Sequence, residues 1–237
     1  MITVITGGTG SIKLLRGIDS ILEEKMTIIT NVADNIWLFG LYICPDIDTT
    51  LYGLSGQLDK KKGWGIRDDT YNWLTSIKES SDNTWFQIGD KDLKTHLFRT
   101  KLFKDGMKLS DITKSISKKM NIKHHVLPAS NQTIETTIIT ENRQMHLQEF
   151  WVKNKGNIPI KDVIYKGIEI AEPVDNITDI IKNSDKIIIA PGNPISSIGP
   201  TISIKKLKRS LKESNAKKIA VSPIIRNKPI SGPAGKM

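Results

Sequence analysis

Residues 2–10 read Ile2-Thr3-Val4-Ile5-Thr6-Gly7-Gly8-Thr9-Gly10, and Lys13 follows shortly after. A β-branched run that stops at glycines predicts a strand followed by a tight turn. A helix that begins near Ser11 would point its positive end and the free N–H groups of the turn at an anion, and Lys13 would add a mobile positive charge. The spacing matches neither the dinucleotide fingerprint nor the P-loop. A turn that needs glycine only for its backbone conformation is the alternative.

The rest of the chain alternates short β-branched runs with helix-like segments, which is typical of a parallel sheet with crossover helices. The expected strands are 2–6, 26–30, 136–140, 186–190 and 218–222. The expected helices are 11–24, 69–79, 110–120, 177–183 and 204–214. The predicted fold class is therefore α/β. Residues from about 90 to 170 depart from the alternation, and we expect them to form an inserted α+β lobe within a single domain of residues 1–237.

The composition favours a globular protein of one domain in a reducing compartment. With 237 residues the chain is long enough to bury a substantial core, and its single cysteine, Cys44, has no partner within the chain. No secretory segment or long apolar span is present near the first strand, so we expect a cytoplasmic protein without a membrane partner. The net charge of +10 comes from lysines dispersed among Asn, Ile and Ser, which argues against a nucleic-acid partner.

Polar loops follow four of the expected strands, and in open α/β sheets ligands bind outside the carboxyl ends of the strands. These loops are 7–10, 31–35, 191–200 and 222–223. The third contains prolines, glycines and a Ser-Ser pair, which predicts a stiff loop rich in hydroxyl and amide donors that suits a nucleobase or a diphosphate. A rigid connection without a ligand is the alternative. We expect the four loops to converge at one site.

Two carboxylates, Asp46 and Asp48, stand two residues apart in the run 41–50. On an extended backbone both would point to the same face, where they would repel unless a metal ion, a substrate hydroxyl or a lysine lay nearby. Asp48 is then a candidate base or hydrogen-bond acceptor for a hydroxyl nucleophile. A turn or a helix N-cap is the alternative. The charged run 89–96 is expected to be a solvated loop, and His96 a structural histidine.

In their order along the chain, these motifs resemble the 2-phospho-L-lactate transferase family, and the resemblance covers nearly the whole chain. Seven motifs carry it, at residues 7–15, 31–35, 45–49, 63–65, 89–92, 193–200 and 222–236. The resemblance implies a Rossmann-like parallel sheet core with an inserted lobe. It also implies transfer of a phospholactyl group from a lactyl-diphospho-guanosine donor to the ribityl hydroxyl of a deazaflavin, with release of GMP, in coenzyme F420 biosynthesis. A phosphoenolpyruvyl donor would differ by a few atoms that no motif reads.

The resemblance further implies roles for particular residues. The acceptor deazaflavin is expected at Asp48, Thr49 and Lys91, and Asp48 is also the expected catalytic residue. The expected donor-binding residues are Gly7, Gly8, Thr9, Gly10, Lys13, Asn31, Asn193, Ser196 and Ser197. Mg²⁺ is expected from the behaviour of the family, with Asp34 as a candidate ligand, and family members resemble homodimers.

Two other function classes stay open. One is a regulatory protein of the related gluconeogenesis-factor group, which shares the glycine turn and binds nucleotide sugars without turnover. The other is a basic nucleic-acid-binding protein, whose binding would weaken steeply with salt. The motifs at 46–49 and 89–92 favour the transferase over the regulatory protein, and the dispersed lysines argue against nucleic-acid binding. Relatives continue beyond the Gly-Pro-Ala-Gly-Lys motif at 232–236, so we expect the C-terminal region of the family to be missing here.

Overall fold

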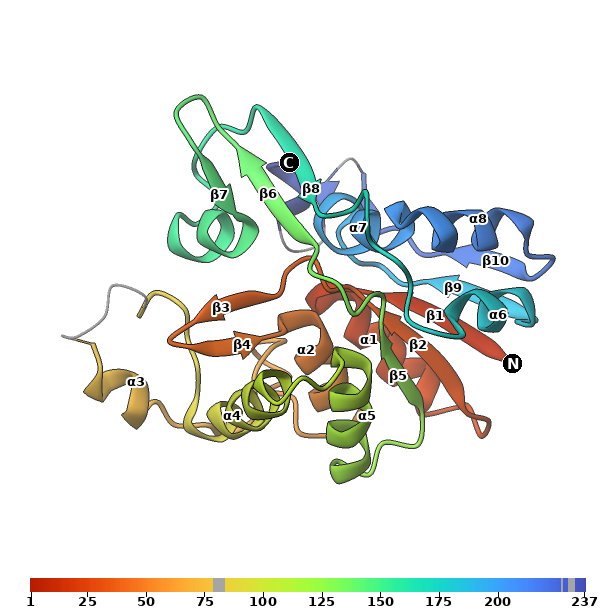
Figure 1. The fold of residues 1–237 in the computed structure, drawn as a ribbon, viewed down its shortest axis with the longest axis horizontal. Helices are drawn as coiled ribbons and strands as arrows, with labels where there is room; N and C mark the ends of the chain where they lie inside the picture. Colours follow the sequence, from red (N-terminus) through yellow and green to blue (C-terminus); the bar gives the residue numbers. More distant parts are fainter. Residues whose placement is uncertain (79–83, 227, 230–232) are drawn as a thin grey trace.

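A five-stranded parallel sheet forms the centre of the protein (Figure 1). The structure is a computed structural model, and it describes residues 1–78, 84–226, 228–229 and 233–237. The strand order is β10-β9-β1-β2-β5, with bounds β1 (Ile2–Thr6), β2 (Met26–Thr30), β5 (His125–Pro128), β9 (Lys186–Ile189) and β10 (Lys217–Ala220). The sheet confirms the α/β fold class. Four of the five expected strands belong to it, and β5 is a strand that the sequence did not reveal.

Strand β1 lies in the middle of the sheet, and its register places Ile5 opposite Ile29 of β2 and Ile189 of β9. Later strands are added on both sides of β1 and β2, so the strand order reverses at β1. In open parallel sheets, such a reversal leaves a crevice at the carboxyl ends of the strands. The glycine turn therefore follows the strand at which the crevice is expected.

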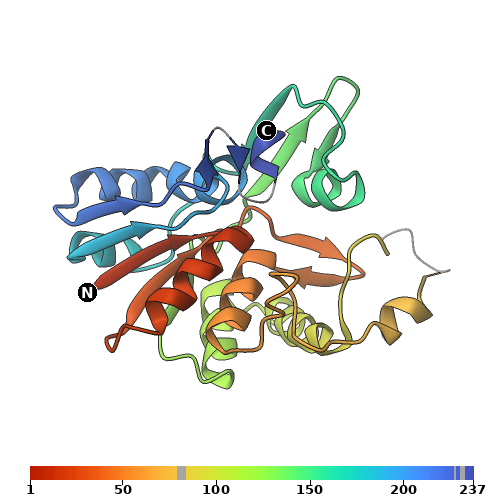
Figure 2. The same cartoon turned by 180° about the vertical axis from the view of Figure 1, so that it is seen from behind.

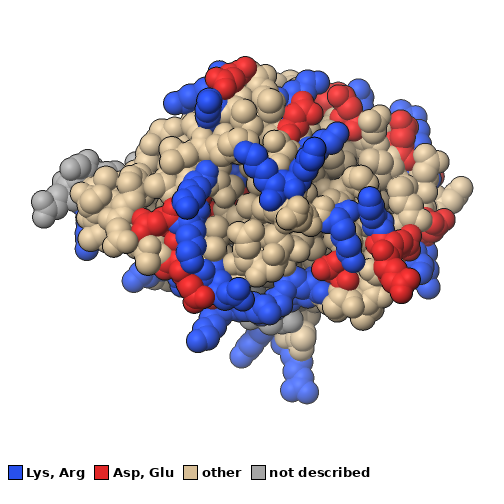
Figure 3. Space-filling view, turned by 90° about the horizontal axis from the view of Figure 1, so that it is seen from below, with Lys and Arg blue, Asp and Glu red and all other residues tan. Residues whose placement is uncertain are grey.

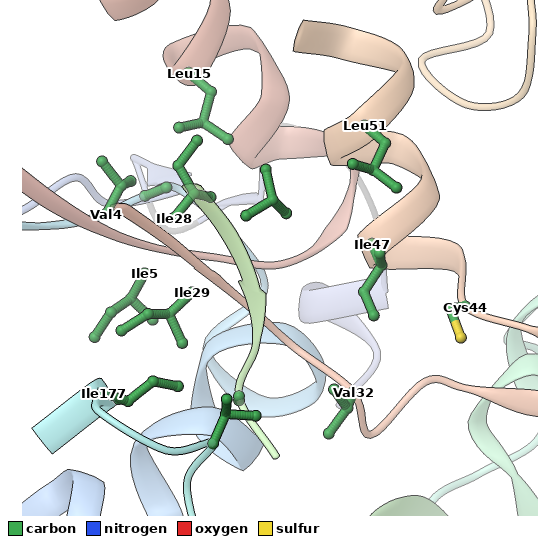
Figure 4. Close-up of a cluster of buried hydrophobic side chains, with 14 of the residues drawn as sticks. Val4, Ile5, Leu15, Ile28, Ile29, Val32, Cys44, Ile47, Leu51 and Ile177 are labelled. Atoms are coloured by element: carbon green, nitrogen blue, oxygen red, sulfur yellow. The ribbon is translucent and has the colours of Figure 1, made fainter. Parts of the chain in front are cut away.

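Helices cover both faces of the central sheet (Figures 1 and 2). Figure 4 shows why the strands are apolar throughout: Val4 and Leu15 lie on one side of the sheet, whereas Ile5 and Ile177 lie on the other. Strands that are buried on both faces are continuous apolar or β-branched runs rather than alternating ones. The helices concerned are α1 (Gly8–Asp19), α6 (Ile177–Lys182), α7 (Gly199–Ser203) and α8 (Lys205–Glu213).

The segment between β2 and β5 carries a hairpin and, among its described residues, four α-helices. It forms the hairpin β3 (Ile36–Leu38) and β4 (Leu41–Ile43), then α2 (Pro45–Leu54), α3 (Asn72–Ser76), α4 (Asp90–Lys104) and α5 (Leu109–Lys119). Two expectations are wrong here. The run 41–50 is extended only up to Ile43, because Pro45 and the acidic residues after it start a helix. The run 89–96 is the first half of α4 rather than a solvated loop.

A second, antiparallel sheet follows β5. Its order is β7-β6-β8, with bounds β6 (Glu135–Ile139), β7 (Gln144–His146) and β8 (Asp162–Lys166). After β7 the chain forms a π-helical turn at Glu149–Lys153. A small core of its own holds this unit together, made of Ile138, Met145, Leu147 and Phe150. Within 90–170, this sheet stands apart from the central one, whereas β5 belongs to the central sheet.

Other expected elements lie close to the observed ones. Helices α5, α6 and α8 match the expected ranges to within one residue at each end. Helix α3 is shorter than the expected helix 69–79, whose last residue lies outside the described residues. The last elements are the hairpin β11 (Ile224–Ile225) and β12 (Lys228–Pro229) and a 3₁₀ turn at Pro233–Gly235. Among the described residues, no helix has the length and apolar character needed to cross a bilayer.

Basic side chains are not gathered in one groove on the face that Figure 3 shows. Lys and Arg lie around a broad uncharged area of this face, and Asp and Glu lie among them. Many of the lysines are on the outer surfaces of helices; in α8, for example, the buried residues are Leu207 and Ser210. The positive net charge of this face is therefore spread over it.

Candidate functional site

A cavity of about 520 Å³ lies at the carboxyl ends of the central strands. The loops after β1, β2, β9 and β10 all contribute to its wall, so the four loops converge as the sequence predicts. The residues that these loops place there are Gly8, Thr9, Gly10, Asp34, Pro191, Asn193, Ser196, Ser197 and Pro223. Helices α2 and α4, the segment 147–152 after β7 and the loops at 64–65 and 85–87 complete the wall. Gly8, Asp48 and Asn193, which are far apart in sequence, therefore face one space.

The glycine turn is shaped by its contact with the loop after β9. Gly8 has a φ of +71°, which favours glycine, and α1 begins at this residue rather than near Ser11. A Cβ on Gly7 would lie 2.7 Å from the Ser197 carbonyl oxygen, and one on Gly10 would lie 2.3 Å from the Pro191 carbonyl oxygen. The glycines thus allow two backbone segments to touch, and they leave the first N–H groups of α1 at the cavity.

The loop after β9 is held by its own side chains. The side-chain oxygen of Asn193 accepts hydrogen bonds from the backbone N–H groups of Ile195 at 2.9 Å and Ser196 at 3.4 Å. Ser196 and Ser197 are buried and line the cavity. This is an N-cap that starts the π-helical turn Pro194–Ile198. It fixes hydroxyl groups beside the glycine turn.

Asn31 gathers two carboxylates at the floor of the site. Its side-chain nitrogen donates to Asp46 Oδ2 at 2.9 Å, to Asp34 Oδ1 at 3.2 Å and to the Ser196 carbonyl oxygen at 3.2 Å. Both carboxylates are buried. Burial raises the pKa of Asp46 to about 6, against hydrogen bonds from Asn31 and the Gly8 N–H that lower it. Burial and the charge of Asp46 raise the pKa of Asp34. The two carboxylates therefore repel each other when both are ionised, and a cation between them would offset this repulsion.

Asp48 forms a buried ion pair with Arg99 of α4. Arg99 donates from one terminal nitrogen to Asp48 Oδ2 at 3.0 Å and from the other to Asp48 Oδ1. The Arg99 side chain has no exposed surface. Burial would lower the pKa of Arg99, but the charge of Asp48 outweighs burial and raises it, so the guanidinium stays charged. Both oxygens of Asp48 are thus occupied by a fixed cation.

A second carboxylate of α4, Asp92, lies beside this pair. The Tyr52 hydroxyl donates to Asp92 Oδ1 at 2.5 Å, and His96 Nε2 lies 3.3 Å from the same oxygen. The other ring nitrogen of His96 lies 3.6 Å from Asp48 Oδ2. Burial would raise the pKa of Asp92, but His96 and the Tyr52 hydrogen bond outweigh burial and lower it. Asp48, Tyr52, Asp92 and His96 all line the cavity.

Comparison with known proteins decides the family. Residues 2–237 match the model of the family described as 2-phospho-L-lactate transferase CofD. The chain belongs to this family, and it is a transferase. It is 40% identical over 235 residues to the 2-phospho-L-lactate transferase of Methanosarcina mazei. This alignment covers 99% of this chain and 77% of that protein. It is 34% identical over 254 residues to a phosphoenolpyruvate transferase of Mycobacterium sp. strain KMS, covering 98% and 77%.

Solved structures agree on the fold. The crystal structure of protein BH3568 from Bacillus halodurans has a TM-score of 0.65 and 22% sequence identity, and the match covers 92% of this chain and 67% of that one. A second structure of BH3568, described as a member of the UPF0052 family, has a TM-score of 0.67 and 21% identity. At this identity the likeness shows a shared fold alone.

Within this CofD-family chain, the residues expected for binding fall into two groups. Those that line the cavity are Gly8, Thr9, Gly10, Asp34, Asp48, Thr49, Asn193, Ser196 and Ser197. Gly7 and Asn31 stand directly behind this wall. Lys13 and Lys91 are outside the lining. The Lys91 ammonium group donates to the carbonyl oxygens of Arg67 at 3.2 Å and Asp68 at 2.6 Å, because its position on α4 differs by about 100° from that of Asp92.

Sequence reasoning missed several residues of the site. Asp92, His96 and Arg99 have the spacing of one helical face, but that signal exists only once 90–104 is known to be a helix. Aromatic side chains form another part of the wall, contributed by Trp64, Trp85, Phe86 and Trp151. Trp37 is not part of the lining and stacks on Tyr42, with ring centroids 5.1 Å apart.

Proposed function

We propose that the protein transfers a phospholactyl or phosphoenolpyruvyl group from a guanosine diphosphate-linked donor to the ribityl hydroxyl of 7,8-didemethyl-8-hydroxy-5-deazariboflavin. GMP would be released, and the step would belong to coenzyme F420 biosynthesis. One observation carries the proposal: a single cavity is lined by a helix N-terminus with its glycine turn, by buried carboxylates and by four aromatic side chains. Such a site offers places for a diphosphate, a hydroxyl and a flat ring system. Family membership supports the proposal.

The donor would bind at the glycine turn and the loop after β9. The first N–H groups of α1, at Gly8, Thr9 and Gly10, have no partner within the helix and lie at the cavity; that of Gly8 would be shared between the donor and Asp46. The Ser196 and Ser197 hydroxyls add donors suited to phosphate oxygens. Twelve residues of helix behind the turn orient the positive end of the dipole toward that place. Transfer would then depend mainly on positioning and charge neutralisation.

The acceptor would bind between the aromatic side chains and α2. Trp64, Trp85, Phe86 and Trp151 supply apolar surface and ring faces for a tricyclic deazaflavin. Asp48 and Thr49 line the cavity beside them and would bind hydroxyl groups of the acceptor. Lys91 would not contact the acceptor directly, because backbone carbonyl oxygens hold its ammonium group, and it would contribute only its positive charge.

Magnesium would be held by Asp34 and Asp46. The donor set fits a hard cation, because two buried carboxylates and the Ser196 carbonyl oxygen converge on one amide nitrogen. The raised pKa values of both acids indicate a site with surplus negative charge. When bound, the ion would neutralise charge on the diphosphate. Asp34 is the ligand expected from the sequence, and we propose Asp46 as the second. A homodimer and a cytoplasmic location stay predictions.

Product analysis tests the proposal. Purified protein is incubated with Mg²⁺, the deazaflavin and either lactyl-diphospho-guanosine or its phosphoenolpyruvyl counterpart, and the mixture is examined by mass spectrometry. We expect equal amounts of GMP and of one phosphorylated deazaflavin, and neither product when the donor is omitted. Binding of the donor without any product would contradict the transferase and favour the regulatory alternative.

A further inference from the structure

Two carboxylates of the cavity, Asp48 and Asp92, differ in how many of their oxygens have a partner among the described residues. Asp48 has one oxygen on each terminal nitrogen of Arg99, so both of its oxygens are committed to a permanent cation. Its side chain is 6% exposed and that of Arg99 is 0% exposed, so water does not screen the pair. Neither oxygen of Asp48 is left without a hydrogen-bond donor from Arg99, so Asp48 is placed to bind or orient a ligand while it remains paired.

Asp92 has the opposite arrangement. Tyr52 and His96 both approach Oδ1, and no hydrogen bond within the described part of the chain reaches Oδ2. The Asp92 side chain is 12% exposed and lines the cavity. Its backbone N–H donates to Asp69 Oδ2 at 3.0 Å, which fixes the start of α4. Oδ2 is thus a free carboxylate oxygen in a side chain that three other residues hold in place.

We propose that Asp92 is the residue that accepts the proton of the acceptor hydroxyl, with Tyr52 as its positioning residue. This inference rests on the proposed function. In the step, the hydroxyl O–H bond breaks and its proton passes to Asp92 Oδ2. The hydroxyl oxygen forms a bond to the phosphorus that carries the lactyl group. The bond from that phosphorus to the bridging oxygen breaks, and its electron pair leaves with GMP. The proton is then lost to water.

The ionised state of Asp92 suits this task. Because phosphoryl transfer passes through a loose transition state, the hydroxyl needs orientation early and loses its proton late. A carboxylate that stays ionised can accept the hydrogen bond from the start, and it needs only moderate basicity. The Tyr52 hydroxyl takes up Oδ1 and leaves Oδ2 for the acceptor hydroxyl, in a side chain that lines the cavity and is held in one orientation.

The test compares Asp92→Asn, Tyr52→Phe and Asp111→Asn with the wild-type protein. Asp111 is the matched control, since it is an exposed aspartate in the first turn of α5. We measure kcat with saturating donor, the dissociation constant of the deazaflavin by its fluorescence, and folding by circular dichroism. For Asp92→Asn we expect kcat to fall by about 10²- to 10⁴-fold with deazaflavin binding within threefold of wild type. Tyr52→Phe should lose about tenfold in kcat with unchanged binding, and Asp111→Asn should match wild type.

Several results would overturn the inference. A kcat loss below tenfold in a folded Asp92→Asn protein would do so, as would a loss of deazaflavin affinity as large as the loss of kcat. If Asp92→Asn does not fold, Tyr52→Phe decides, and unchanged kcat in that variant contradicts the inference. If wild type and Asp92→Asn both form product at similar rates, the role of Asp92 is contradicted and the proposed function stands. No product from wild type removes the proposed function and the inference with it.

Discussion

Asp46→Asn is expected to stabilise the folded protein at neutral pH, although it removes a residue of the site. The Asp46 carboxylate is buried beside Asp34, and the two share the amide of Asn31. Burial raises the pKa of Asp46 from 3.8 to about 6. A group whose pKa is raised by folding costs stability when the pH is above that pKa, because the folded state then holds a charge that it disfavours. Asparagine keeps the shape and removes the charge.

The size of the effect follows from the shift. Two pKa units correspond to about 3 kcal/mol at about 1.36 kcal/mol per unit, which is an upper bound for a coupled pair. The loss of an acidic residue from the first turn of α2 offsets about 0.3–1 kcal/mol of this gain. A net gain of at most about 2–3 kcal/mol remains at pH 7.5. The gain should fall to about half at pH 5, where the carboxyl is already protonated in the folded state.

Urea unfolding at pH 7.5 and pH 5.0 measures this prediction, with Asp111→Asn as the control for the same chemical change on an exposed helix start. Mg²⁺ adds a second readout: it should raise the midpoint of thermal unfolding of wild type and leave Asp46→Asn nearly unchanged. A variant that is less stable than wild type at pH 7.5, or a gain that does not depend on pH, would refute the reasoning. The control should stay within about 0.5 kcal/mol of wild type.

Three further outcomes are expected. Asp48→Asn leaves the buried Arg99 guanidinium without its carboxylate and should cost about 3–5 kcal/mol in urea unfolding; a cost below about 1 kcal/mol would argue against the ion pair. Burial lowers the pKa of His124, so unfolding free energy should fall as pH drops below about 6.5, where only the unfolded state takes the proton; a His124→Gln variant with the same pH slope would contradict this. Gly10→Ala would place a Cβ 2.3 Å from the Pro191 carbonyl oxygen and should weaken GDP binding at least tenfold by calorimetry, whereas unchanged affinity would exclude this turn from the donor site.

The central sheet could be predicted because its strands are buried on both faces. Ile2–Thr6 and Met26–Thr30 are wholly buried, and such strands leave continuous β-branched runs in the sequence. The loops after these strands were recognisable for the same reason, since each begins where the run stops. Their meeting at one cavity then follows from the parallel topology alone.

Helix α4 could not be predicted in the same way because its buried face is polar. The buried residues of α4 include Asp92, His96 and Arg99, together with threonines, so the apolar period that marks a helix is missing. Charged side chains were therefore read as solvated, although they pair with one another inside the protein. When the buried face of a helix carries polar residues of a functional site, its sequence shows those functional residues but lacks the apolar periodicity by which a helix is predicted.

The two acids of α2 show how secondary structure changes an interpretation. On an extended backbone Asp46 and Asp48 would share one face, but on a helix they are about 200° apart. Asp46 consequently contacts Asn31, whereas Asp48 contacts Arg99. Neither acid is an N-cap, because α2 begins at Pro45 with Cys44 as its N-cap, and its first turn gives the two acids different partners.

A crystal structure of the protein with GDP and the deazaflavin precursor would test the central claim most directly, namely that one cavity holds both substrates. The account predicts diphosphate oxygens within hydrogen-bond distance of the N–H groups at Gly8–Gly10 and the deazaflavin ring against Trp64, Trp85 or Trp151. It also predicts the ribityl hydroxyl next to Asp92 Oδ2. GDP bound away from the glycine turn, or the deazaflavin on another surface, would contradict it.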